Sequence, residues 1–94
     1  MKLFKEKIIE DTSTYILVKR YFMSTLIEEE LNWHMDKEDR DIFVIKGDGW
    51  YIQIENEIPK LMQKHLVYNI PKNTWHRIIN KNRSNLEINV KKYK

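Results

Sequence analysis

The chain has 94 residues, 41% of them hydrophobic and 12% aromatic, and its 17 basic and 14 acidic residues give a net charge of +3. This composition is typical of one globular domain over residues 1–94, and the lack of cysteine excludes a disulfide scaffold or a thiolate metal site. Because the chain has no apolar run of membrane-spanning length, no secretory segment and no nucleic-acid-binding motif, we expect a cytoplasmic protein without nucleic-acid or membrane partners.

Strand-forming residues dominate the chain from its start. Residues 3–9 and 14–23 are the first two predicted strands, and the second is apolar on both faces, as expected of a strand that is covered twice. Residues 26–35 follow as a third predicted strand; a single helical turn over 27–31 is the alternative, but it lacks a clear cap.

The rest of the chain alternates strands with turns. A strand over 41–46, the turn Gly47-Asp48-Gly49 and a strand over 50–55 predict a hairpin, because glycine allows the positive φ that hairpin turns require. Further strands are predicted over 58–62, 65–70, 75–79 and 86–91. Many short strands with turn signals between them indicate one all-β, antiparallel sandwich or barrel.

Two stretches have a distinctive spacing of polar residues. In residues 34–47, His34 and Asp36 are followed after three residues by Arg40 and, after six more, by Gly47. In residues 65–80, five residues separate His65 from Pro71, and Asn73, His76 and Asn80 follow at fixed intervals.

These stretches resemble the two motifs of the cupin superfamily, which are His-x-His…Glu…Gly and Gly…Pro-x-Gly-x-x-His-x-x-x-Asn. The spacing fits without a gap, but Asp36 replaces the second histidine and Arg40 the glutamate of the first motif. His65 and Asn73 replace the glycines of the second motif. Asn73 is a mild change, since asparagine also tolerates the left-handed turn conformation. The second motif is similar to that of the cupin domain of type II mannose-6-phosphate isomerases.

The resemblance implies a jelly-roll barrel, also called a double-stranded β-helix, with a small-molecule site inside it. In a strand, His34 and Asp36 share one face, and His76 is the remaining histidine in a matching motif position. Two histidines and one carboxylate are a ligand set for Fe(II) and related divalent ions, so we expect Fe, Mn, Zn or Ni as the cofactor. Open coordination positions would then admit substrate or water.

Arg40 weighs against this interpretation, because an arginine aimed into the cavity would repel a cation. It could instead pair with Asp36, or bind a phosphate or carboxylate of a ligand. The resemblance implies a mannose-6-phosphate isomerase-like site for a sugar or sugar phosphate, with unknown catalytic residues. The alternatives are a metal-free binding or sensing cupin, favoured if Arg40 pairs with Asp36, and a metal-free sugar epimerase or ketoisomerase with a histidine base. We also expect a homodimer formed through the N-terminal strands.

Overall fold

A computed structural model describes residues 4–26 and 31–94. These residues form eight strands: β1 (Phe4–Asp11), β2 (Tyr15–Phe22), β3 (Arg40–Lys46), β4 (Trp50–Ile54), β5 (Lys60–Leu61), β6 (Val67–Ile70), β7 (His76–Asn80) and β8 (Leu86–Tyr93). The described residues contain no helix that is long and apolar enough to cross a membrane.

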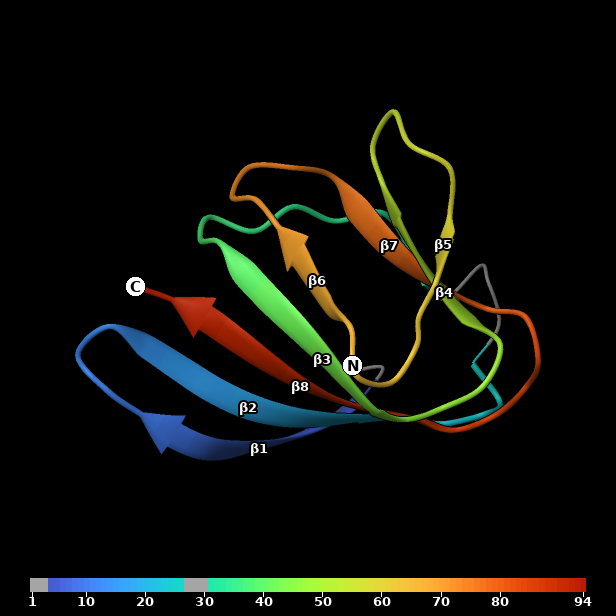
Figure 1. Cartoon of the computed structure of the whole chain (residues 1–94), viewed down its shortest axis with the longest axis horizontal. Helices are drawn as coiled ribbons and strands as arrows, with labels where there is room; N and C mark the ends of the chain where they lie inside the picture. Colours follow the sequence, from blue (N-terminus) through green and yellow to red (C-terminus); the bar gives the residue numbers. More distant parts are fainter. Residues whose placement is uncertain (1–3, 27–30) are drawn as a thin grey trace.

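The strands form two antiparallel sheets that face each other (Figure 1). The larger sheet has the order β1-β2-β8-β3-β6 and the smaller one the order β5-β4-β7. β8 pairs with β2 over all eight of its residues and with β3 on its other side, so the C-terminal strand lies in the middle of the larger sheet. The predicted all-β, antiparallel fold is confirmed.

The core fills the space between the sheets. Val18 and Phe22 of β2 alternate with outward residues, and Leu86, Ile88 and Val90 do the same on β8. Fully burying such a side chain stabilises the fold by about 1.5–3 kcal/mol. The alternation therefore fixes which face of each strand points inward, and with it which polar side chains enter the interior.

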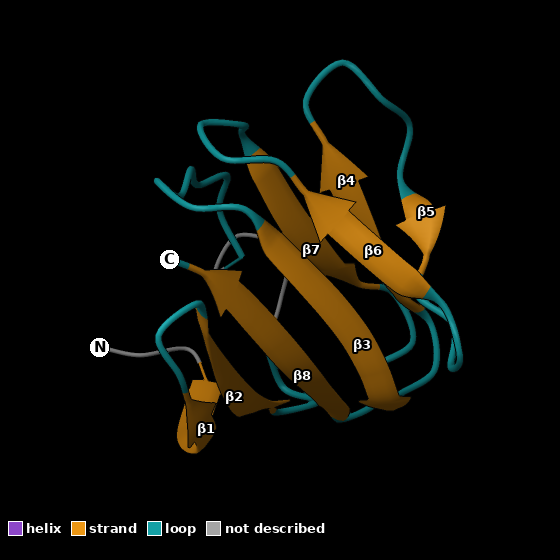
Figure 2. Cartoon of the chain, turned by 60° about the vertical axis from the view of Figure 1, so that its left-hand side comes forward, coloured by secondary structure: helices purple, strands orange, loops and turns teal. Residues whose placement is uncertain are grey.

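The predicted hairpin is wrong, because β3 and β4 lie in different sheets (Figure 2). Gly49 does adopt a left-handed conformation, with φ of 73°. However, the turn packs on the loop between β7 and β8: Lys81 N donates to Gly49 O at 2.9 Å and Asp48 N to Ser84 Oγ at 3.1 Å. These bonds direct β4 away from β3 and across to the smaller sheet.

The predicted strand over 26–35 is also wrong where it can be compared. Residues 27–30, with most of the alternative helical turn, lie outside the described residues. Over 31–35 the chain forms only an isolated bridge, between His34 and His76. The other predicted strands are confirmed with shifted ends, and those over 58–62 and 65–70 shorten to β5 and β6.

Candidate metal centre

The two sequence motifs meet along three backbone hydrogen bonds. His34 and His76 exchange both of their backbone N–H···O bonds, each at 2.9 Å, and Asn73 N donates to Asp36 O at 2.7 Å. Asn73 can make this turn because it takes a left-handed conformation, with φ of 58°, as its glycine position in the motif predicts. The backbone therefore holds the segment around His34 and Asp36 beside the start of β7.

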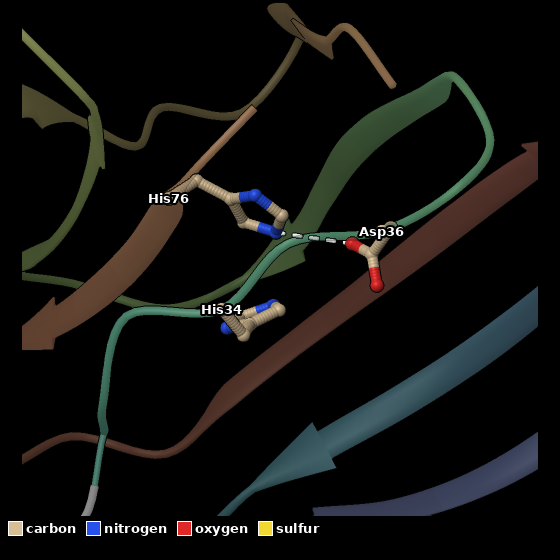
Figure 3. A group of neighbouring side chains, drawn as sticks. All are labelled: His34, Asp36 and His76. Carbon is tan, nitrogen blue, oxygen red and sulfur yellow. Dashed lines mark ion pairs between the residues drawn. The ribbon is translucent and has the colours of Figure 1, made fainter. Parts of the chain in front are cut away.

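This pairing brings His34, Asp36 and His76 together, and we call these three residues the ligand group (Figure 3). One potential ligand atom from each lies within 4.8 Å of the others. His76 Nε2 is 3.2 Å from Asp36 Oδ2, and the two imidazole rings lie 4.1 Å apart in an edge-to-face arrangement. The sequence analysis predicted that these three residues come together, but it did so from a strand over 26–35, and residues 34–36 are not part of a strand.

The other nitrogen of each imidazole contacts a backbone carbonyl. His76 Nδ1 is 3.0 Å from Thr74 O, and His34 Nδ1 is 3.3 Å from Asn32 O. A carbonyl oxygen can only accept, so Nδ1 carries the proton in each ring, and Nε2 of a neutral ring presents a lone pair. Histidine ligands of metals commonly have this arrangement.

As a consequence, two acceptors face each other inside the protein. Asp36 Oδ2 is a buried oxygen without a hydrogen-bond partner among the described residues, and it faces Nε2 of His76. The His76 side chain is only 4% exposed. Burial lowers the pKa of His76 below its usual value of 6.5, against the opposing effects of the Thr74 carbonyl and Asp36, and so favours the neutral ring. If the ring is neutral, a lone pair of His76 Nε2 and one of Asp36 Oδ2 point at the same position.

Arg40 contacts the ligand group rather than open solvent. Its Nη2 is 3.0 Å from Asp36 Oδ1 and 2.7 Å from Glu38 Oε1, which also accepts from Nε at 3.1 Å. Burial alone would raise the pKa of Glu38, but the hydrogen bond and charge of Arg40, helped by Lys92, hold it below its usual range. Glu38 is therefore a partner of Arg40, a role that the motif spacing does not predict.

A cavity of about 270 Å³ lies beside the ligand group, between the sheets. Its wall is mainly apolar, and its polar residues are Arg20, Asn32, Arg40 and the ligand group. Arg40 and the ligand group therefore line one cavity.

Arg20 is a cavity residue that the sequence analysis missed. Its Nε donates to Glu6 Oε1 at 2.8 Å, and its guanidinium lies 4.3 Å from the ring centre of Phe4. The signal was present, because Arg20 falls on the same inward face of β2 as Val18 and Phe22. A charged residue between two core residues of a strand has to reach a partner or a cavity.

Comparison with known proteins supports the fold. No protein-family model and no curated protein sequence matches this chain. Among solved structures, an RmlC-like cupin family protein with a double-stranded β-helix fold from Methanocaldococcus jannaschii is 20% identical, with a TM-score of 0.73 over 99% of this chain and 82% of its own.

Two other solved structures are similarly close in fold. KdgF from a Halomonas species is 17% identical, with a TM-score of 0.77 over 100% of this chain and 83% of its own. A candidate mannose-6-phosphate isomerase from Ralstonia eutropha JMP134 is 11% identical, with a TM-score of 0.76 over 96% of this chain and 83% of its own. The chain therefore has the cupin fold, as its two motifs predict, and these identities carry no conclusion beyond the fold.

Proposed function

We propose that this cupin-fold chain binds one divalent metal ion, of Fe, Mn, Zn or Ni, through His34, Asp36 and His76. The observation that carries the proposal is the buried Oδ2 of Asp36, which faces Nε2 of His76 and lacks a hydrogen-bond donor among the described residues. A cation would satisfy both lone pairs at once. Imidazole nitrogen and carboxylate oxygen are also the ligand types that these ions accept.

Three protein ligands leave coordination positions open towards the cavity. An ion held there would polarise a carbonyl or activate a water molecule. The chain itself would contribute orientation: Nδ1–H bonds to Thr74 and Asn32 hold the two rings, and Arg40 holds one oxygen of Asp36 while the other remains available.

For the ligand we propose a sugar or sugar phosphate, with a mannose-6-phosphate isomerase-like reaction as the first activity to test. The similarity of the second motif to that of type II isomerases supports this proposal, and so does the fold of the candidate isomerase from Ralstonia eutropha. The apolar wall would contact the sugar carbons, and the guanidinium of Arg40 suits a phosphate group.

One observation favours a second candidate, a metal-free binding module. The ion pair between Arg40 and Asp36, at 3.0 Å, already supplies a positive charge to the carboxylate that would serve the metal. A metal-free epimerase or ketoisomerase would use a histidine as base, and the lowered pKa of His76 would keep its ring unprotonated at neutral pH.

Metal titration of the purified protein separates these candidates. After dialysis against a chelator, we expect Co(II) or Zn(II) to bind with one ion per chain at neutral pH, measured by calorimetry. His76→Ala should abolish binding, whereas His65→Ala, a change at an exposed histidine without a place in the cavity, should leave it intact. Failure of Fe(II), Mn(II), Zn(II) and Ni(II) alike to bind would overturn the metal proposal.

The homodimer remains a further proposal. β1 forms an edge of the larger sheet, and Ile8 and Ile9 on it are 61% and 47% exposed. Pairing of this edge with a second copy would cover both side chains. Light scattering after size exclusion would test it, and a monomeric mass at high protein concentration would contradict it.

A further inference from the structure

Two cationic side chains line the cavity and a third lies beside them, and only Arg40 was expected there. Arg20 of β2 and Arg40 of β3 both line the cavity. Lys92 of β8 lies beside them: its Nζ is 3.5 Å from Glu6 Oε1, the same oxygen that accepts from Arg20 Nε at 2.8 Å. We call Arg20, Arg40 and Lys92 the basic group.

The basic group is largely withdrawn from solvent. The exposed fractions of its side chains are 12% for Arg20, 11% for Arg40 and 23% for Lys92. Burial is the main cause that lowers the pKa of Lys92, and the positive charges of Arg20 and Arg40 lower it further. The three cations therefore lie close enough to repel one another, in surroundings that screen their charges less than water does.

Among residues 4–26 and 31–94, the charges of the basic group and of its carboxylate partners cancel when no metal ion is bound. The basic group contributes three positive charges, and its ion-pair partners Glu6, Asp36 and Glu38 contribute three negative ones. A divalent ion on the ligand group would leave a surplus of two positive charges in this partly buried space. Uncompensated charge of that kind is costly inside a protein unless an anion neutralises it.

We propose that the cavity binds a small dianion, a phosphate monoester or a dicarboxylate, between Arg20 and Arg40 beside the metal position, and binds it after the metal. The proposal rests on the proposed metal site and adds to it the class of ligand and the order of binding. Each guanidinium presents several N–H donors in a planar fork that matches carboxylate and phosphate oxygens. Arg20 is then a ligand-binding residue, although neither motif includes it.

The size of the cavity limits the ligand further. At about 270 Å³ it lies just below the range of about 300–1,000 Å³ that is typical of pockets for drug-sized molecules. The ligand that fits is small, from a four- or five-carbon diacid up to a sugar monophosphate, and a sugar nucleotide exceeds this space. The apolar part of the wall would contact its carbon chain.

Calorimetric titration of two probes tests the inference. Inorganic phosphate and malonate are each titrated into the Co(II)-loaded protein, without excess metal, and into the protein held in chelator. We expect binding to the loaded protein to be at least about tenfold tighter, because the two positive charges of the ion remain uncompensated in a partly buried site until an anion binds. Whichever probe binds tighter identifies phosphate or dicarboxylate as the source of the dianion.

Two variants with opposite expected effects separate a binding role of Arg20 from a merely structural one. Arg20→Gln should weaken anion binding by about tenfold or more and leave Co(II) binding unchanged, with Arg20→Lys between the two. Glu6→Gln keeps an acceptor for Arg20 but removes the negative charge that competes with the anion, so it should tighten anion binding. Partial unfolding of the variant would weaken anion binding, so tighter binding by Glu6→Gln cannot result from it.

The outcomes also distinguish this inference from the metal proposal. If Co(II) binds but neither anion binds better to the loaded protein, the inference is overturned and the metal proposal stands. If Arg20→Gln and Glu6→Gln leave the affinity for both anions unchanged, Arg20 has no role in binding. If no divalent ion binds at all, the metal proposal fails, and with it the order of binding proposed here.

Discussion

Replacing Asp36 by asparagine tests the metal proposal through the stability of the protein, in chelator and with added zinc. The substitution keeps the shape of the side chain. It allows Nδ2 to donate to His76 Nε2, now 3.2 Å from Asp36 Oδ2, while Oδ1 still accepts from Arg40 Nη2 at 3.0 Å. An acceptor–acceptor contact would become a hydrogen bond.

Two opposing contributions determine how Asp36→Asn changes the free energy of unfolding. Satisfying a buried acceptor recovers about 1–3 kcal/mol, whereas turning the ion pair with Arg40 into a hydrogen bond to a neutral amide loses roughly 1–1.5 kcal/mol. If His76 is neutral, Asp36→Asn should therefore leave the free energy of unfolding unchanged or raise it by up to about 2 kcal/mol. Added Zn(II) should stabilise the parent chain, by about 2.7 kcal/mol at a hundredfold excess over Kd, but not the variant.

A protonated His76 predicts the opposite change in stability. If His76 is instead a protonated partner of Asp36, removing the carboxylate breaks a buried ion pair at a cost of about 3–5 kcal/mol. In a domain of this size that loss lowers Tm by more than roughly 12 °C. Thermal and urea unfolding in chelator at neutral pH measure the difference.

A matched control is available at Glu38. Glu38→Gln weakens the other ion pair of Arg40, at 2.7 Å, without touching either histidine. It should destabilise the protein modestly and weaken the zinc effect without abolishing it, because Asp36 and both histidines remain while the charge of Arg40 is no longer balanced. A large loss of stability in Asp36→Asn, together with no zinc effect in the parent chain, would refute the metal proposal.

Three further predictions concern pH, a turn and the core. Burial gives His76 a folded-state pKa below its usual 6.5, so the unfolded chain takes up the proton first as the pH falls. The contribution of His76 to stability in chelator should therefore be complete above about pH 6.5 and decrease as the pH drops towards the folded-state pKa. Urea unfolding at a series of pH values measures this, and a His76→Gln variant should lack that part of the loss. Gly49→Ala should lower the free energy of unfolding by about 1–3 kcal/mol, because φ at this position is 73° and the new Cβ would collide with Asn82. Thermal unfolding measures the change, and a Tm equal to that of the parent chain would contradict the prediction. Trp50→Phe should lower the free energy of unfolding by at least about 1 kcal/mol, measured in the same way. Trp50 is fully buried, and the substitution leaves Ser84 O without the indole N–H that now donates to it at 2.7 Å. An unchanged free energy of unfolding would show that the indole hydrogen bond contributes nothing.

The sequence predicts the local features of the site well. Asn73 and His65, at the two glycine positions of the second motif, both take positive φ, at 58° and 68°. A turn conformation is set by a few neighbouring residues, so motif spacing is enough to locate it. The meeting of His34 with His76 was expected from the resemblance to the two cupin motifs, and the structure shows it as an isolated bridge.

Features that depend on distant partners were not predictable in this way. The turn at 47–49 has hairpin chemistry, yet its backbone bonds go to Lys81 and Ser84, more than thirty residues along the chain. Arg20 was visible as a charge on the inward face of β2, but its partner Glu6 and the cavity beside it are set by the pairing of β1 with β2. The alternation of apolar and polar residues predicts the face of the strand on which a side chain lies. Which residue it contacts depends on how neighbouring strands pair and in which register, and the sequence pattern alone does not give this.

The arginine at position 40 is the departure from the cupin motif that most directly opposes a metal ion, and its contacts reduce that opposition. Glu38 accepts from both Nε and Nη2, so the charge of Arg40 is balanced before Asp36 is counted. Arg40 then contacts only Oδ1 of Asp36 and leaves Oδ2 directed at His76. One carboxylate can in this way hold an arginine with one oxygen and a cation with the other. The charge reversal at position 40 is therefore compatible with a metal site, provided that Glu38 stays ionised, and the lowered pKa of Glu38 favours that state.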